Sequence, residues 1–82
     1  MKKIKVPEIQ TDVEQILKDI GVKIRTHRKS IAKNYEDFAF DHNFNKVTIS
    51  RIENGKNYTL STLIKVLHTM NISLEDFFKG IR

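Results

Sequence analysis

The sequence has no cysteine, no long apolar run and no internal repeat or low-complexity segment in its 82 residues. Without cysteine, disulfides and thiolate metal sites are excluded. No apolar run approaches the roughly 18 residues of a membrane span, and the basic start Met1–Pro7 lacks the apolar stretch of a secretory signal. We therefore expect a cytoplasmic protein without a membrane partner. A chain of this length buries roughly 60–65% of its unfolded surface, enough for one domain with a modest core and no deep substrate cleft.

The positive charge is unevenly distributed along the chain. The net charge is +5, and residues 1–34 carry nine Lys or Arg against four Asp or Glu, whereas residues 35–82 carry six of each. A basic chain with a pI of about 9.6 favours a nucleic-acid partner, since lysine and arginine neutralise phosphates. A solvated, lysine-rich face is the alternative that charge alone leaves open.

Hydrophobic periodicity and capping residues predict an all-α fold of five helices, and no segment is typical of a sheet. Pro7 bars a helix from the first residues, so residues 1–10 are expected to form an N-terminal arm. The first helix is expected from Asp12 to Lys29, begun by a capping box of Thr11 and Glu14, with Gly21 as a weak point. Its inward stripe is expected to be Val13, Leu17, Ile20 and Ile24, with Lys18, Lys23, Arg25 and Arg28 turned away.

Four shorter helices are each expected to follow a capping side chain. The caps are Asn34 before Tyr35–His42, Asn45 before Lys46–Asn54, Thr59 before the fourth helix and Ser73 before the fifth. Asn43 tolerates the left-handed backbone of a tight helix end. The predicted core residues of these helices are Phe38, Ala39, Ile49, Ile52, Leu60, Leu63, Ile64, Leu67, Met70, Leu74, Phe77 and Phe78.

Two short helices joined by a tight turn, Tyr35–His42 and Lys46–Asn54, have the spacing of a helix-turn-helix. With Ile49 and Ile52 directed inward, the other face of the second helix is polar and cationic. A helix about 10–12 Å across fits a major groove about 12 Å wide. The outward residues are expected to be Lys46, Val47, Ser50, Arg51 and Asn54.

Several strings carry a specific resemblance. They are Gly21–Arg25 with Arg28, Glu36–Ala39, Ile49–Lys56 (Ile-Ser-Arg-Ile-Glu-Asn-Gly-Lys), Leu60–Leu63 and Asn71–Phe78. Together these strings resemble the lambda-repressor-like (Cro/repressor-type, xenobiotic-response-element) helix-turn-helix family over residues 17–79. The resemblance implies a compact five-helix DNA-binding domain over residues 11–82 that reads the major groove with its third helix.

The resemblance also implies roles for individual residues. Lys46, Val47 and Arg51 match base-reading positions, with Thr48 and Ser50 as further candidates, and Asn45 matches the recognition-helix cap. Tyr35 stands where many members have a phosphate-binding glutamine. Arg28 and Glu53 match a structural ion pair between the first helix and the end of the recognition helix, and Ala39 matches the small residue between the two motif helices. The phosphate-contacting loop corresponds to Asn54, Lys56, Asn57 and Tyr58.

The chain departs from the family pattern at three further places. Asn43 replaces the usual turn glycine, and His42 stands at a normally apolar position, where partial exposure is expected. The loop after Gly55 is one residue short, with Tyr58 where proline is common. These departures leave the loop's phosphate contacts open.

Other kinds of site find little support in the sequence. His27, His42 and His68 lie on three expected helices without metal-ligand spacing, and no nucleophile elbow or glycine-rich phosphate loop is present. We expect no metal, cofactor, small-molecule ligand or enzymatic activity. The five phenylalanines are typical of core residues rather than base-stacking platforms, with Phe40 and Phe44 expected to be partly exposed.

The expected function is sequence-specific binding of double-stranded DNA by a small transcriptional regulator, a repressor acting by occupancy. An antitoxin or a restriction-modification controller with the same DNA-binding domain is the alternative, and a protein-interaction module on this fold is another. One recognition helix reads only about 4–6 base pairs, so a homodimer on a two-fold symmetric operator is expected. Its candidate surfaces are Ile4 with Val6 and Phe78 with Ile81, although the N-terminal arm is equally consistent with an unpaired segment.

Overall fold

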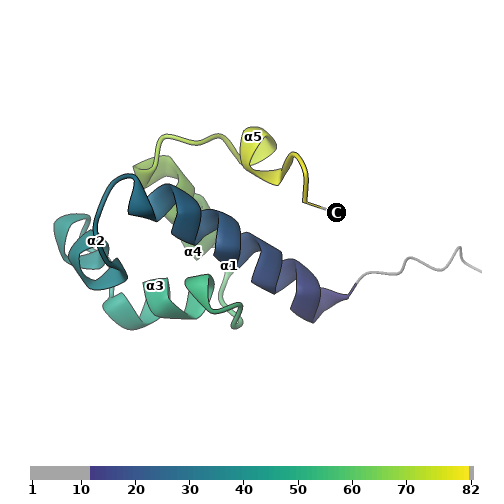
Figure 1. The fold of residues 1–82 in the computed structure, drawn as a ribbon, viewed down its shortest axis with the longest axis horizontal. Helices are drawn as coiled ribbons and strands as arrows, with labels where there is room; N and C mark the ends of the chain where they lie inside the picture. Colours follow the sequence, from purple (N-terminus) through teal and green to yellow (C-terminus); the bar gives the residue numbers. More distant parts are fainter. Residues whose placement is uncertain (1–11, 82) are drawn as a thin grey trace, which may run out of the picture.

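The computed structural model describes residues 12–81, and within them the chain forms five α-helices and no strand (Figure 1). The all-α prediction is therefore confirmed. None of these helices has the length and apolar character that crossing a membrane requires. The expected arm over residues 1–10 lies outside the described residues. The helices are α1 (Val13–Lys29), α2 (Tyr35–Asp41), α3 (Lys46–Glu53), α4 (Leu60–Thr69) and α5 (Leu74–Phe78).

Each helix begins at a side chain that accepts a hydrogen bond from a backbone N–H of its first turn. Asn34, Asn45, Thr59 and Ser73 cap α2 to α5 as predicted. The cap of α1 is Asp12, whose carboxylate accepts from Gln15 N at 3.2 Å. The predicted cap, Thr11, is therefore wrong by one residue. Because these bonds join residues only two or three positions apart, the starts of the helices can be predicted from the sequence.

Left-handed residues separate the shorter helices. Asn43 has φ 61° between α2 and α3, Gly55 has φ 72° after α3, and Asn71 has φ 59° after α4. Asparagine and glycine tolerate this conformation because their side chains are small or absent. Asn43 therefore performs the turn that glycine performs in the family pattern.

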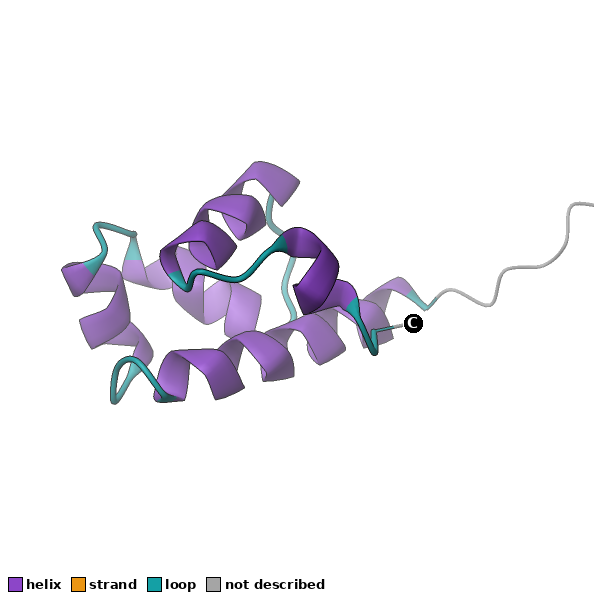
Figure 2. Ribbon diagram, turned by 90° about the horizontal axis from the view of Figure 1, so that it is seen from above, coloured by secondary structure: helices purple, strands orange, loops and turns teal. Residues whose placement is uncertain are grey.

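The helices enclose a single apolar core. The long helix α1 runs along the bundle and packs against α3, which also packs against α2, while α5 follows α4 near the C-terminal end (Figures 1 and 2). The side chains of Phe38, Phe77 and Ile24 are among the largest that are fully buried. Within residues 12–81, the buried core comprises Ile20, Ile24, Phe38, Ala39, Ile49, Ile52, Leu63, Val66, Leu67, Met70 and Phe77.

The predicted apolar faces of the helices differ from the observed ones mainly in the first turns of α1, α4 and α5. Leu60, expected inward, is 60% exposed, and Val13 is 64% exposed. Both lie in the first turn of their helices, one turn before the position where neighbouring helices cover the stripe. Leu74 is likewise exposed, and Ile64 only half-buried. Val66 is fully buried instead, because it lies on the face shared by Leu63, Leu67 and Met70.

Three of the four cations of α1 that were expected to face away from the core, Lys23, Arg25 and Arg28, donate hydrogen bonds to other parts of the fold. Lys23 donates through Nζ to the carbonyl oxygens of Phe77 and, at 2.8 Å, Lys79. The same ammonium lies 5.2 Å from the centre of the Phe77 ring, a cation–π geometry. Lys23 therefore attaches the end of α5 to α1. Arg28, also expected outward by periodicity, is buried.

Gly21 lies where α1 crosses the end of α3. A Cβ atom added at Gly21 would lie 2.6 Å from the carbonyl oxygen of Glu53 and 2.7 Å from that of Ile52. Real Cβ atoms do not approach so closely, so the absence of a side chain permits the two backbones to meet. Gly21 is thus a contact point rather than the weak point expected from helix propensity.

Candidate nucleic-acid interface

The unit formed by α2, the turn at Asn43 and α3 is held from inside. Phe38 and Ala39 of α2 and Ile49 and Ile52 of α3 are all buried in the core. Phe44, in the turn, is half-buried and stacks parallel to Phe38 with ring centres 6.1 Å apart. Because one side of α3 is covered in this way, its opposite side is fixed as the surface of the molecule.

The outward side of α3 carries exposed residues at helical spacing. Val47 is 59% exposed, the Lys46 side chain is 64% exposed, and Arg51 one turn later is also exposed. The Lys46 ammonium lies 3.9 Å from the Glu36 carboxylate, and such an exposed pair contributes little to the stability of the fold. Thr48 and Ser50 are half-buried. Because the Lys46 ammonium is exposed and only weakly paired, it is available to contact a bound partner.

Three polar side chains of the candidate set have internal hydrogen bonds. Asn45 Oδ1 accepts from Val47 N at 2.8 Å. Asn54 Nδ2 donates to the backbone oxygen of Ser50 at 2.8 Å and to its Oγ at 3.2 Å. Asn54 Oδ1 in turn accepts from Arg25 Nη2 at 3.3 Å. These bonds orient the two ends of α3 and the Ser50 hydroxyl in the absence of any partner.

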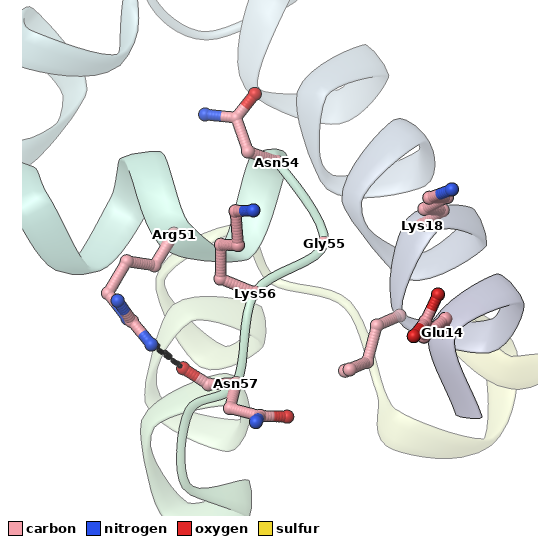
Figure 3. Close-up of a pocket in the computed structure, with 8 residues that line it drawn as sticks. Glu14, Lys18, Arg51, Asn54, Gly55, Lys56 and Asn57 are labelled. Atoms are coloured by element: carbon pink, nitrogen blue, oxygen red, sulfur yellow. Dashed lines mark hydrogen bonds between the residues drawn. The ribbon is translucent and has the colours of Figure 1, made fainter.

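Arg51 contacts the loop that follows α3. Its Nε and Nη2 both donate to the carbonyl oxygen of Asn57, each at 3.1 Å, and Figure 3 shows the guanidinium turned toward that carbonyl. One edge of the guanidinium, expected to be available for a base, is therefore occupied by the protein's own main chain.

The loop itself presents two exposed residues beside a shallow hollow. Lys56 and Asn57 are exposed, and the hollow lies between this loop and the first turns of α1, where Glu14 and Lys18 contribute to its wall (Figure 3). Tyr58 is half-buried against the core, and its hydroxyl is buried without a hydrogen-bond partner. That hydroxyl is directed into the protein, so in this conformation it offers no contact to a phosphate.

A buried ion pair joins α1 to the end of α3. Arg28 Nε and Nη2 donate to the two carboxylate oxygens of Glu53, each at 2.8 Å, and both side chains are almost fully buried. The hydrogen bonds to Glu53, reinforced by its charge, raise the pKa of Arg28 although burial opposes the shift. Arg28 Nη1 also donates to the backbone oxygen of Lys33 at 3.1 Å. Arg28 and Glu53 therefore stand in the geometry that the family resemblance implies.

Sequence reasoning missed Arg25 as a second partner of Glu53. Arg25 Nε lies 3.3 Å from Glu53 Oε1, and Nη2 donates to the Glu53 backbone oxygen at 3.4 Å. Its position three residues before Arg28, on the same face of α1, was the signal that could have identified it. The last turn of α3 is thus held by two arginines of α1.

The remaining candidates occupy different environments. Tyr35, at the start of α2, is half-buried and packs against the core. His42 is exposed, with its ring 4.7 Å from that of Phe38. Phe40 is 86% exposed, more than the partial exposure expected. Among residues 12–81, no group of three or more metal-ligating side chains is assembled.

Replacing Tyr58 with phenylalanine is expected to raise the free energy of unfolding by about 1 kcal/mol, because a buried hydroxyl without a partner costs about 1–3 kcal/mol. Burial also raises the pKa of the Tyr58 phenol above its usual 10.0. A raised folded-state pKa contributes stability below about pH 10 that is lost as the pH rises through the folded value. Thermal unfolding at pH 7 and pH 11 should therefore show a larger advantage of Tyr58→Phe at pH 11.

Tyr35→Phe is the matched control for Tyr58→Phe, since it removes the other tyrosine hydroxyl of the chain. We expect it to leave the melting temperature almost unchanged at pH 7. A melting temperature lowered by Tyr58→Phe would show that the hydroxyl has a hydrogen-bond partner in solution.

The fold and the α2–turn–α3 geometry define a helix-turn-helix protein. A helix-turn-helix family model matches residues 24–77, and the chain belongs to this lambda-repressor-like, Cro/C1-type family of DNA-binding regulators. Comparison with curated proteins and comparison with solved structures each gave no match.

Proposed function

We propose that the protein is a transcriptional regulator that binds a specific sequence of double-stranded DNA and represses by occupying it. The observation that carries this proposal is the outward face of α3, where Lys46, Val47 and Arg51 are exposed while Ile49 and Ile52 anchor the helix in the core. A helix fixed in this way can enter the major groove without rearrangement. The proposed location of this regulator is the cytoplasm.

Base recognition is assigned to the exposed side of α3. Lys46 supplies a point charge for guanine acceptors, and Val47 supplies an apolar contact for a thymine methyl group. The Arg51 donors not used by the loop, with Thr48 and Ser50 beside them, complete this surface. Phosphate contacts are assigned to residues at the ends of the motif, namely Tyr35, Asn45, Asn54, Lys56 and Asn57.

A homodimer on a two-fold symmetric operator is part of the proposal, because one helix reads too few base pairs to find a site among about 10⁶ competitors. Phe78 and Ile81 are half-buried and Leu74 is exposed, so the C-terminal end offers apolar surface to a second copy. The two half-sites are then about one DNA turn apart.

The test of the proposed function is selection of bound sequences from random duplexes, followed by affinity measurements on the selected site and on scrambled DNA. On the selected site Lys46→Ala is expected to cost about 1–3 kcal/mol and relax the preference at one position. Lys56→Ala is expected to weaken both DNAs alike and reduce the salt slope by about one ion per subunit.

Lys65→Ala is the matched control, since it removes an exposed lysine from α4, outside the helix-turn-helix, and should leave the preference unchanged. The symmetry of the selected site and sedimentation of the complex report the dimer. Absence of any enriched sequence would reject sequence-specific regulation, and a monomer on an asymmetric site would reject the dimer.

A second candidate function is that of an antitoxin, which combines this DNA-binding domain with a protein partner. The observation in its favour is Phe40, an aromatic side chain 86% exposed on α2, since aromatic residues are frequent anchors of protein interfaces. A neighbouring gene whose product is toxic alone, and forms a defined complex with this chain, would establish this function. Absence of such a gene would reject the antitoxin function and leave that of a repressor.

A further inference from the structure

We propose that Arg51 is a positioning residue, which holds the loop between α3 and α4 in place and so couples base contacts on α3 to phosphate contacts on the loop. The inference rests on the proposed function, because it concerns how the same DNA surface is organised. It differs from the expectation that Arg51 acts as a base reader alone.

Arg51 contacts the loop through both its main chain and its side chain. Its backbone oxygen accepts from Lys56 N at 2.9 Å, a contact typical of a helix end that turns through a left-handed residue such as Gly55. Its guanidinium donates twice to the Asn57 carbonyl at 3.1 Å. Two successive loop residues are therefore bound to one residue of α3, the first through the main chain and the second through the side chain.

The loop is anchored on either side of this contact. At Gly55 the main chain passes so close to Lys18 of α1 that an added Cβ would lie 3.1 Å from Lys18 Cγ. Tyr58 packs against the core at the other side. Between these anchors the side chains of Lys56 and Asn57 are exposed, so core packing does not orient them. The Arg51 guanidinium holds the main-chain carbonyl of Asn57 and so fixes the backbone from which these two side chains project.

Only one edge of the Arg51 guanidinium is bound to the loop. Nε has one proton and gives it to Asn57, and Nη2 gives one of its two. The Nη1 protons and the second Nη2 proton remain for an acceptor on DNA. Arg51 can therefore hold the loop and meet a base or phosphate at the same time, which links the two kinds of contact mechanically.

The first experiment needs no DNA and follows amide hydrogen exchange at Lys56. Arg51→Ala is expected to speed exchange of this amide about three- to tenfold, the effect of losing one or two ordinary hydrogen bonds, while amides in the core of α1 are unaffected. Arg51→Met keeps a long stem without donors and should behave like Arg51→Ala. Unchanged exchange at Lys56 in either variant overturns the proposal, whether or not the protein binds DNA.

The second experiment combines Arg51→Met with Lys56→Ala and measures affinity on scrambled DNA. If Arg51 positions the loop, Arg51→Met already removes part of the contribution of Lys56 to affinity. The affinity of the double variant is then higher than expected from multiplying the fold-losses of the two single variants. Lys46→Ala is the matched control, because Lys46 lies on the same face of α3 but pairs with Glu36 rather than the loop.

For Lys46→Ala we expect hydrogen exchange at Lys56 as in the wild type. Its fold-loss of affinity should multiply with that of Lys56→Ala in the double variant. Losses that multiply for Arg51 as they do for Lys46 would overturn the coupling. Failure of the wild-type protein to bind any duplex would instead reject the proposed function, and the exchange result would still test the loop contact.

Discussion

Replacing Glu53 with glutamine is expected to lower the free energy of unfolding by about 3–5 kcal/mol, the typical loss when one partner of a buried ion pair is removed. Glu53 is 6% exposed and Arg28 5% exposed, so the substitution leaves a buried guanidinium without its countercharge. Arg25 loses the same partner. For a domain of this size the melting temperature should fall by at least about 12 °C, as thermal unfolding followed by circular dichroism will show.

The control for Glu53→Gln is Glu36→Gln, the same chemical change in an exposed pair. The Glu36 and Lys46 side chains are 56% and 64% exposed, and such pairs contribute about 0–1 kcal/mol. Equal effects of the two substitutions would show that the Arg28–Glu53 pair is solvated in solution and does not hold α3 to α1.

Replacing Gly21 with alanine is expected to destabilise the protein by about 1–3 kcal/mol, the usual result of forcing a methyl group into a packed contact. Helix propensity alone predicts the opposite, since alanine is favoured over glycine by about 1 kcal/mol inside a helix. The atoms in the way are the backbone oxygens of Glu53 and Ile52, which cannot rotate aside as a side chain would. Chemical denaturation of Gly21→Ala measures the balance.

Val22→Ala is the comparison for Gly21→Ala, one residue further along α1 and 61% exposed in the native protein. This side chain is largely exposed and alanine improves helix propensity, so we expect a stability equal to or slightly above that of the wild type. If Gly21→Ala also stabilised the protein, the close approach of α1 to α3 would not exist in solution.

The helix starts and the turns were predictable because they depend on residues a few positions apart. A cap such as Asn34 bonds to the N–H of Asp37, and a left-handed residue such as Asn43 ends a helix through its own backbone. The largest errors in the predicted core, at Val13, Leu60 and Leu74, lie in the first turns of their helices. Leu60 continues the stripe of α4, but the neighbouring helices do not reach its position, and periodicity has no information on where they end.

The candidate site was predictable as a surface but not as a set of contacts. The inward pattern of Ile49 and Ile52 identified the outward face of α3, and the exposure of Lys46 and Val47 agrees with it. The same periodicity placed Arg51 among freely exposed residues. Its contact with Asn57 depends on the path of a loop with no regular period, so sequence patterns did not reveal it.

The sequence by itself determined the five helices, the caps of α2 to α5 and the polar face of α3, because these depend on short-range hydrogen bonds and on the spacing of apolar residues. The tertiary structure decided which polar groups meet across the bundle. Arg25 and Arg28 lie 28 and 25 residues from Glu53 in the chain, and Gly21 meets the backbone of α3 at a similar separation. Such contacts exist because α1 crosses the end of α3 at one distance and angle, and that geometry results from the packing of the whole core.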